Sequence, residues 1–340
     1  MNQEIEWSEL GFGYYPTDYN VRCEYKDGKW GPITVTDDVN INIHMAATCL
    51  HYGQEAFEGL KAFRGVDGKI RVFRMDENAK RFISSAEGIK MPPLPEEIFK
   101  EMVIKVIKAN ERFVPPYGSG ASFYIRPLEI GMSAQVGVKP AKDYLVLMFG
   151  TPVGPYFKSG FKPGKMCIMR GYDRAAPKGT GRFKIGANYA ASLYSGELAR
   201  EMGYSAALYL DPKDKLYLDE CGPANFFAIK DGKYITPKSD SILPSITNKT
   251  LQQLAQDAGL EVERRRIRVE ELAEVDEAAA CGTAAVATPI ATIDDIDKGI
   301  TYTIAKDGKP GEIVTMLYNK LRDIQLGKCE DVHGWTTIVE

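Results

Sequence analysis

The segment Lys178-Gly-Thr-Gly-Arg-Phe-Lys184-Ile-Gly-Ala-Asn-Tyr189 decides how the rest of the chain is interpreted. Glycines on both sides of Lys184 let the backbone turn tightly and approach a ligand without a Cβ in the way. Phe183 and Ile185 flank the lysine, so we expect its amine to be partly shielded from water. Shielding lowers the pKa of an ammonium group and favours the neutral nucleophile that a bond to an aldehyde requires. On these residues alone, a surface lysine in a glycine-rich loop is the more ordinary interpretation.

Length and composition exclude several classes of protein. The 340 residues are enough for two domains of ordinary size, and 44% apolar with 26% charged residues is typical of globular chains. A net charge of −3 provides no basic field for nucleic acid or for an anionic membrane. No apolar run approaches the roughly 18 residues of a membrane span. The segment Met1-Asn-Gln-Glu-Ile-Glu-Trp7 lacks the basic and apolar regions of a secretion signal.

The cysteines indicate neither a metal site nor a disulfide framework. They are scattered without a CxxC pair, and the chain has only three histidines, so the pattern does not predict a zinc site. A chain of this size needs no disulfides for stability, so we expect reduced thiols and a cytoplasmic location.

Several segments resemble, in the same order, the motifs of branched-chain amino acid aminotransferases, which are pyridoxal-phosphate enzymes of fold type IV. Besides Lys184-Ile-Gly-Ala-Asn-Tyr189, they include the aromatic and glycine-rich segment His51–Gly65 and the strand-like Tyr124-Ile-Arg-Pro127. Glu220-Cys-Gly-Pro-Ala-Asn225 and residues 243–248 and 281–285 match as well. The hexamer Pro152-Val-Gly-Pro-Tyr-Phe157 is typical of the eukaryotic-type branch of this family.

The resemblance implies an α/β (α+β) fold of two domains, with mixed sheets, flanking helices and an active site at the domain interface. Prolines and glycines cluster between residues 150 and 164, as in an interdomain connection. We therefore predict a smaller domain over 1–156, a linker over 157–171 and a larger cofactor-binding domain over 172–340. Apolar residues recurring at helical spacing predict a helix over 96–110.

The resemblance also implies pyridoxal 5′-phosphate as the cofactor and assigns residues to it. Lys184 is the catalytic residue, which holds the cofactor aldehyde and then moves a proton. Glu220 faces the pyridine nitrogen and keeps it protonated. Arg81 binds the phosphate and Tyr189 the phenolate oxygen. The remaining cofactor-binding residues are Arg174, Ile246, Thr247 and Thr283.

For the substrate, the resemblance assigns an apolar pocket and a carboxylate site. Strand alternation places Tyr124 and Arg126 on one face, where the family binds substrate carboxylate. The other implied substrate-binding residues are Tyr52, Phe57, Tyr156, Ala284 and Ala285. The chain departs from the family pattern at three positions: Pro223 replaces a common threonine, Ser245 a usual glycine and Asn248 a frequent arginine.

These residues imply amino-group transfer between L-leucine, L-isoleucine or L-valine and 2-oxoglutarate, in the biosynthesis or degradation of branched-chain amino acids. The expected partners are branched-chain amino acids, 2-oxo acids and glutamate, without nucleic acid, membrane or metal. The family resemblance further implies a homodimer with residues from both subunits at each site. The alternatives are another fold type IV enzyme, a D-amino acid aminotransferase or an aminodeoxychorismate lyase, and a non-catalytic protein that binds the cofactor.

Overall fold

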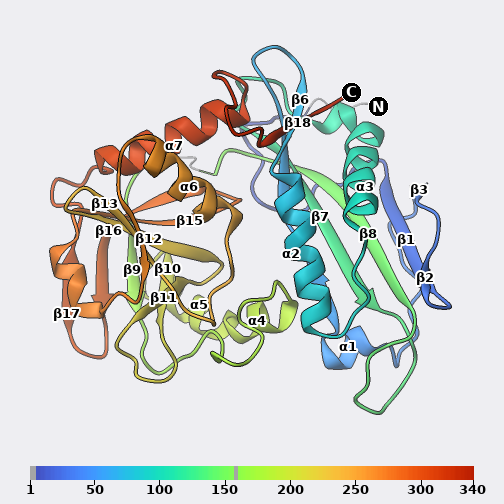
Figure 1. Ribbon diagram of the computed structural model, residues 1–340, viewed down its shortest axis with the longest axis horizontal. Helices are drawn as coiled ribbons and strands as arrows, with labels where there is room; N and C mark the ends of the chain where they lie inside the picture. Colours follow the sequence, from blue (N-terminus) through green and yellow to red (C-terminus); the bar gives the residue numbers. More distant parts are fainter. Residues whose placement is uncertain (1–4, 157–159) are drawn as a thin grey trace. The chain divides into compact units, whose positions relative to one another are not determined.

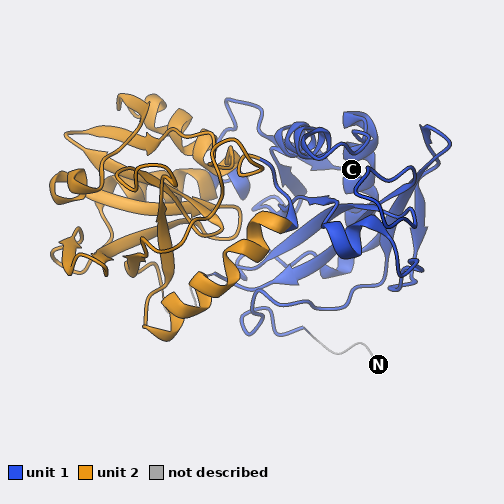
Figure 2. Ribbon diagram, turned by 90° about the horizontal axis from the view of Figure 1, so that it is seen from below, with its two compact units in different colours: residues 1–156, 183–186, 323–340 blue, residues 157–182, 187–322 orange. Residues whose placement is uncertain are grey.

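The computed structural model describes residues 5–156 and 160–340, which form two compact units. Unit 1 comprises Met1–Tyr156, Phe183–Gly186 and Asp323–Glu340, and unit 2 comprises Phe157–Arg182 and Ala187–Arg322 (Figure 2). Among the residues that the structure describes, no helix has both the length and the apolarity needed to cross a lipid bilayer.

Unit 1 is built on a nine-stranded sheet in the order β18-β6-β5-β7-β8-β1-β2, with β3 paired to β1 and β4 paired to β7. Its strand pairings are antiparallel. The strands are β1 (Asn20–Lys26), β2 (Lys29–Trp30), β3 (Thr34–Thr36), β4 (Glu55–Phe57), β5 (Leu60–Arg64), β6 (Ile70–Phe73), β7 (Ser122–Gly131), β8 (Tyr144–Val153) and β18 (Thr336–Val339).

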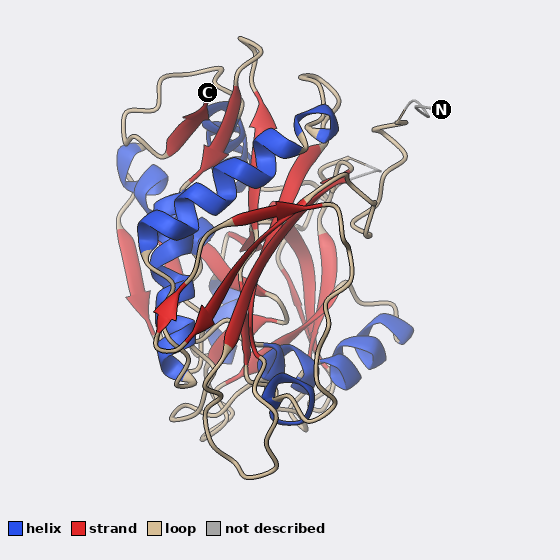
Figure 3. Ribbon diagram, turned by 90° about the vertical axis from the view of Figure 1, so that its right-hand side faces the viewer, coloured by secondary structure: helices blue, strands red, loops and turns tan. Residues whose placement is uncertain are grey.

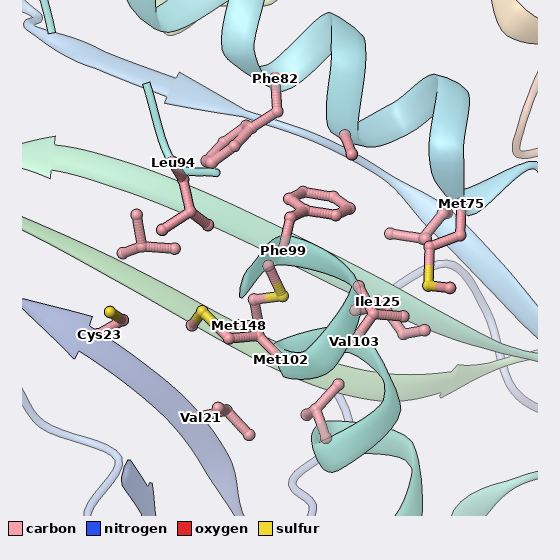
Figure 4. Close-up of a cluster of buried hydrophobic side chains, with 14 of the residues drawn as sticks. Val21, Cys23, Met75, Phe82, Leu94, Phe99, Met102, Val103, Ile125 and Met148 are labelled. Atoms are coloured by element: carbon pink, nitrogen blue, oxygen red, sulfur yellow. The ribbon is translucent and has the colours of Figure 1, made fainter. Parts of the chain in front are cut away.

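Two amphipathic helices, α2 (Met75–Gly88) and α3 (Glu96–Ala109), cover one face of this sheet, as Figures 1 and 3 show. Ring centroids of Phe82 and Phe99, one from each helix, lie 5.4 Å apart in the core, where they meet Val21 and Met148 of the sheet (Figure 4). The predicted helix over 96–110 is observed as α3. The helical segments of unit 1 are α1 (Thr48–Tyr52), α2 (Met75–Gly88), α3 (Glu96–Ala109) and the 3-10 turn η1 (Glu111–Phe113).

Unit 2 contains a second nine-stranded sheet, which is mixed. Its order is β11-β10-β9-β16-β15-β12-β13-β14, with β17 on β16, and an additional pairing of β11 with β12 closes six strands into a ring. The pairs β9–β10, β9–β16 and β13–β14 are parallel. The strands are β9 (Gly164–Ile168), β10 (Ala206–Leu210), β11 (Leu218–Cys221), β12 (Ala224–Lys230), β13 (Lys233–Pro237), β14 (Val262–Arg265), β15 (Glu277–Gly282), β16 (Val286–Asp295) and β17 (Ile300–Thr303).

The helices of unit 2 include α4 (Gly186–Ala191) and α5 (Leu193–Glu201), which are separated by a single residue. The break falls at Ser192, whose hydroxyl donates to the Tyr189 carbonyl oxygen at 2.9 Å and competes with the helical pattern. The helical segments are α4 (Gly186–Ala191), α5 (Leu193–Glu201), α6 (Ile246–Asp257), the 3-10 helix η2 (Val269–Glu274) and α7 (Glu312–Gln325), which runs on into unit 1.

The compact units depart from the predicted domains at three places. The C-terminal residues join unit 1, because β18 pairs with β6 and completes the hydrogen bonding of what would otherwise be an edge strand. Residues 183–186 also belong to unit 1, because Phe183 and Ile185 pack into its core. The predicted linker 157–171 contains β9, a strand of the second sheet; its residues 157–159 lie outside the described residues.

Candidate active site

Lys184 is held by its backbone against unit 1. The Phe57 N–H of β4 donates to the Lys184 carbonyl oxygen at 3.0 Å, and the Lys184 N–H donates to Ser85 Oγ of α2 at 2.9 Å. The side chain is half-buried, and its Nζ lies 4.4 Å from the centroid of the Phe57 ring. The amine therefore lies against an aromatic face, in agreement with the expectation that water is partly excluded from it.

Glu55 holds the turn that follows the lysine. Its carboxylate accepts a hydrogen bond from the Gly186 N–H at the first residue of α4. A Cβ at position 186 would lie 2.0 Å from Glu55 Oε1, so a larger residue there would have to displace this carboxylate. Burial raises the pKa of Glu55, although the Gly186 N–H and the positive charges of Arg126 and Lys184 act in the opposite direction.

Arg81, the predicted phosphate ligand, forms a bidentate ion pair with the fully buried Glu58. Arg81 Nε lies 2.6 Å from Glu58 Oε1 and its Nη2 lies 2.9 Å from Oε2, which also accepts from Asn78 Nδ2 at 2.7 Å. Burial favours a higher pKa for Glu58, but Arg81, Lys184 and Asn78 together hold its pKa below the usual value. Glu58 takes two of the five guanidinium N–H groups, so the pair fixes the direction of the opposite edge.

Tyr124 and Arg126 lie on one face of β7, as their spacing predicted. Arg126 Nη2 donates to the Tyr124 hydroxyl at 3.0 Å, and the guanidinium carbon lies 4.9 Å from the Phe57 ring centroid. The Arg126 Nε is buried, yet no described residue accepts its hydrogen bond. A buried donor without an acceptor is costly, and a ligand carboxylate would supply the acceptor.

The remaining predicted residues of unit 1 are more exposed. Tyr52 ends α1, stacks on His51 with ring centroids 4.2 Å apart and donates a hydrogen bond to the Val136 carbonyl oxygen. Tyr156 is 53% exposed at the end of the first segment of unit 1. The contacts described for Tyr52 thus lead to the loop around Val136 and not to Lys184.

In unit 2, Glu220 is a fully buried carboxyl at the end of β11, not a surface residue. Arg174 Nη2 lies 2.6 Å from Glu220 Oε1, which also accepts from the Leu243 N–H at 3.0 Å. Asn225 Nδ2 donates to Oε2 at 3.0 Å. Burial raises the pKa of Glu220 to about 7, against the opposing effect of Arg174 and of these hydrogen bonds. Near neutral pH its carboxyl can therefore hold or release a proton.

The N-terminus of α6 brings Ile246 and Thr247 together as its first two residues. Ser245 caps the helix, and its Oγ accepts from the Asn248 N–H at 3.2 Å. The N–H groups of Ile246 and Thr247 have no acceptor within the helix and carry the positive end of its dipole, which suits a phosphate. The departure at position 245 is thus a normal helix cap.

Thr283, Ala284 and Ala285 form the loop of the β15–β16 hairpin, whose last pair is Gly282 and Val286. Val286 has a φ of 68°, in the left-handed region that a β-branched residue rarely adopts. Such backbone strain persists where the surroundings impose it and is frequent at functional sites.

Hydrogen bonds within unit 2 connect the residues that precede Lys184 with one another and with the helix that follows it. Arg174 Nη2 donates to the Gly181 carbonyl oxygen at 2.8 Å, and Thr180 exchanges two hydrogen bonds with Asn188 of α4, at 2.8 and 2.9 Å. Tyr189, the next residue of α4, is half-buried. Pro223 is exposed in the two-residue turn between β11 and β12, so this departure affects a turn.

Sequence reasoning missed Glu55, Glu58, Asn78 and Ser85. One signal could have found part of this set: Asn78, Arg81 and Ser85 have the spacing of one helical face, which is unusually polar for a face that packs against a sheet.

Comparison with known proteins identifies the family. A family model described as amino-transferase class IV matches residues 55–293, well over half of the chain, and this range includes Lys184 and Glu220. The chain belongs to the class IV aminotransferases.

Relatives within that class define the family more narrowly. The branched-chain-amino-acid aminotransferase of Haemophilus influenzae is 44% identical over 99% of this chain and 100% of its own length. The solved branched-chain aminotransferase of Escherichia coli is 27% identical, with a TM-score of 0.79 over 96% of this chain and 100% of that one. The Thermobaculum terrenum enzyme, solved in its pyridoxal-phosphate form, is 25% identical with a TM-score of 0.78 over 95% and 99% of the chains. This chain is thus a member of the branched-chain aminotransferase family, and the predicted family and fold class are confirmed.

Proposed function

We propose that the protein transfers amino groups between L-leucine, L-isoleucine or L-valine and 2-oxoglutarate, giving branched 2-oxo acids and L-glutamate, in the biosynthesis or degradation of branched-chain amino acids. The carrying observation is Glu220, a buried carboxyl with a pKa of about 7, in a chain 44% identical to a branched-chain-amino-acid aminotransferase. A protein that only bound a phosphate would not need this carboxyl.

The proposed cofactor is pyridoxal 5′-phosphate. When bound, it supplies an aldehyde for covalent attachment and a ring that withdraws electrons from the substrate Cα. Lys184 Nζ would hold the aldehyde, and Glu220 would keep the ring nitrogen protonated. Arg81 supplies a fixed guanidinium, and the N-terminus of α6 supplies helical N–H groups; each of these by itself suits a phosphate. The proposed cofactor-binding residues are Arg81, Arg174, Lys184, Tyr189, Glu220, Ile246, Thr247 and Thr283.

For the substrate we propose an apolar surface beside one arginine, whose guanidinium can either bind a carboxylate or remain hydrated. Phe57 would contact the branched side chain, and Arg126 would bind the second carboxylate of glutamate. The Arg126 Nε supports this role, because no residue in the described part of the chain accepts its hydrogen bond and a carboxylate would do so. The proposed substrate-binding residues are Tyr52, Phe57, Tyr124, Arg126, Tyr156, Ala284 and Ala285.

Lys184 would also carry the proton of the reaction. With its amine released by substrate, the neutral Nζ could take the proton from the substrate Cα and pass it to the C4′ carbon of the cofactor. The hydrogen bonds from Phe57 and to Ser85 fix the Lys184 backbone, so that only the side chain has to move.

We further propose a cytoplasmic homodimer in which both subunits contribute to each site. Four exposed side chains, which we call the apolar patch, support an interface on unit 1: Met45, Leu50, Val136 and Val138. The Gln135 N–H donates to the Ala46 carbonyl oxygen at 3.0 Å, which brings the two segments of the patch together. All six cysteines are free thiols, which supports a reducing compartment.

The test of this function is consumption of L- and D-amino acids by the purified protein with 2-oxoglutarate and pyridoxal phosphate. We expect turnover of L-leucine, L-isoleucine and L-valine, with glutamate formed in equal amount. Turnover of D-amino acids instead, or release of pyruvate from aminodeoxychorismate, would assign the protein to another fold type IV activity. Cofactor binding without any turnover would indicate a non-catalytic protein.

A further inference from the structure

Glu220 lies beside a buried asparagine on the neighbouring strand. Glu220 of β11 and Asn225 of β12 are direct partners in the antiparallel ladder, which places their side chains on one face of the sheet. Asn225 Nδ2 donates both to Glu220 Oε2 at 3.0 Å and to the Leu243 carbonyl oxygen at 3.1 Å. The side-chain NH₂ of Asn225, and not its carbonyl oxygen, therefore faces the Glu220 carboxyl.

A second buried asparagine, Asn248 of α6, fixes that orientation. Asn248 Nδ2 donates to Asn225 Oδ1 at 3.1 Å and to Thr236 Oγ1 at 2.9 Å, while its Oδ1 accepts from the Tyr234 hydroxyl at 2.9 Å. Thr236 donates its own proton to the Phe226 carbonyl oxygen at 2.7 Å, so its oxygen can only accept from Asn248.

The hydrogen bonds consequently run in one direction. Asn248 donates to Asn225, and Asn225 donates to Glu220, with each donation polarising the next. Thr236 donates nothing toward Glu220 but accepts from Asn248 and so fixes the orientation of its amide. We call Asn225, Asn248 and this anchoring Thr236 the amide relay. A hydrogen bond donated to the ionised form of a carboxyl stabilises that form.

We propose that Asn225 and Asn248 are positioning residues for the reaction, which keep the Glu220 carboxylate ionised and aligned so that the proton shared with the cofactor stays on the ring nitrogen. The inference rests on the proposed function of Glu220. It gives a role to Asn248, the position where the sequence departs from the family arginine, and it requires no contact between these asparagines and the cofactor.

The other groups that stabilise the ionised form of Glu220 are Arg174 and the Leu243 N–H, and both contact Oε1. Arg174 contacts Oε1, whereas Asn225 is bound to Oε2. The negative charge of Asp219 acts against ionisation of Glu220. Burial strongly raises the pKa of the Cys221 and Cys281 thiols, so both are neutral and contribute no counter-charge.

The experiment is nitrogen NMR of the holoenzyme reconstituted with pyridoxal phosphate that carries ¹⁵N in its ring, because the chemical shift distinguishes a protonated from an unprotonated ring nitrogen. Asn225→Leu, Asn248→Leu and Thr236→Val remove the relay at successive distances from Glu220. We expect a protonated nitrogen in the wild type. In Asn225→Leu the ratio of protonated to unprotonated nitrogen should fall by about tenfold, the effect of one hydrogen bond to an ionised group. Smaller falls should follow for Asn248→Leu and then Thr236→Val.

Thr250→Val is the matched control, since Thr250 donates to the Ile246 carbonyl oxygen at 2.9 Å inside the same helix and its loss tests general destabilisation of α6. It should lower the melting temperature and leave the nitrogen signal unchanged. Folded relay variants with the wild-type signal, or a Thr250→Val shift as large as theirs, would overturn the inference. An unprotonated nitrogen in the wild type would instead refute the role proposed for Glu220 itself, and the relay with it. Should Asn225→Leu not fold, Asn248→Leu and the mild Thr236→Val decide the matter.

Discussion

Arg126 combines an aromatic environment with one unsatisfied donor, and this combination allows a test of substrate recognition. Arg126→Ala should slow the half-reaction with L-glutamate about tenfold or more, because a charge-assisted hydrogen bond contributes on the order of 1.5–3 kcal/mol. The half-reaction with L-leucine, which has no second carboxylate, should change much less. Single-turnover rates with each amino acid measure the difference, and Arg126→Lys serves as the charge-retaining control. Equal losses for both amino acids would mean that Arg126 only supports the wall of the pocket.

Glu129 is a buried carboxyl of β7 that has no hydrogen-bond partner among the described residues. Burial raises the pKa of Glu129 from its usual 4.5 to about 9. The folded state thus keeps the proton that the unfolded chain loses, so the contribution of Glu129 to stability is fully present below pH 4.5 and is lost as the pH rises toward 9. Glu129→Gln removes this titration while keeping the shape.

We therefore expect the free energy of unfolding of Glu129→Gln to increase, relative to that of the wild type, as the pH rises from 5 to 8. Urea unfolding at both pH values measures the difference, whose limit is about 1.36 kcal/mol per pH unit. A difference that does not change with pH would show that the carboxyl is ionised or hydrated in the folded protein.

Residue by residue, the sequence predicted the features that depend on local spacing. The shared face of Tyr124 and Arg126 followed from strand alternation, and the partial burial of Lys184 followed from its apolar neighbours. The partners of these residues were beyond prediction, because Glu58 meets Arg81 across 23 positions and Asn248 meets Asn225 across the same separation. Pairs of this kind form only when distant elements pack together, and no local sequence pattern indicates which elements will meet.

At the scale of elements, α6 shows how a departure from the family pattern is tolerated. Ser245 supplies a side-chain cap where the family has glycine, and both residue types are accepted at this position of a helix. Ser245→Ala should lower the free energy of unfolding by about 1 kcal/mol. Ser245→Gly should lower it by only about a few tenths of a kcal/mol. Thermal unfolding of the two variants tests this order. Equal destabilisation by both would mean that the Ser245 hydroxyl does not act as a cap.

Elements with strong periodicity, such as α3, were predicted well, since helix formation there depends on a repeating apolar face. The segment after Lys184 does not form one continuous helix. Ser192 offers the backbone a competing hydrogen bond, and the result is two short helices.

At the scale of the whole molecule, each unit assembles segments that are far apart in the sequence. The four residues around Lys184 and the last strand belong to unit 1, although both follow residues of unit 2 in the chain. No local sequence pattern indicates that the chain re-enters unit 1 at these places. The strand β18 pairs with β6, which lies more than 250 residues earlier.

The apolar patch leads to a prediction about assembly. Met45 is 88% exposed, and Met45→Asp would place a charge in the proposed interface. Light scattering should find a dimer for the wild type and a larger monomer fraction for Met45→Asp. Val332→Asp, at a residue that is 71% exposed outside the patch, is the control and should remain dimeric. A wild-type monomer, or a Met45→Asp variant as dimeric as the wild type, would contradict an interface at this surface.

The central claim is that Lys184 carries the cofactor, and borohydride treatment followed by peptide mapping tests it most directly. Borohydride makes the bond between the lysine and pyridoxal phosphate permanent, so mass spectrometry can locate it. We predict that the mass of the reduced cofactor appears on the peptide containing Lys184, and that Lys184→Ala abolishes both the label and amino-group transfer. The label on any other lysine, or its persistence in Lys184→Ala together with full activity, would contradict the account.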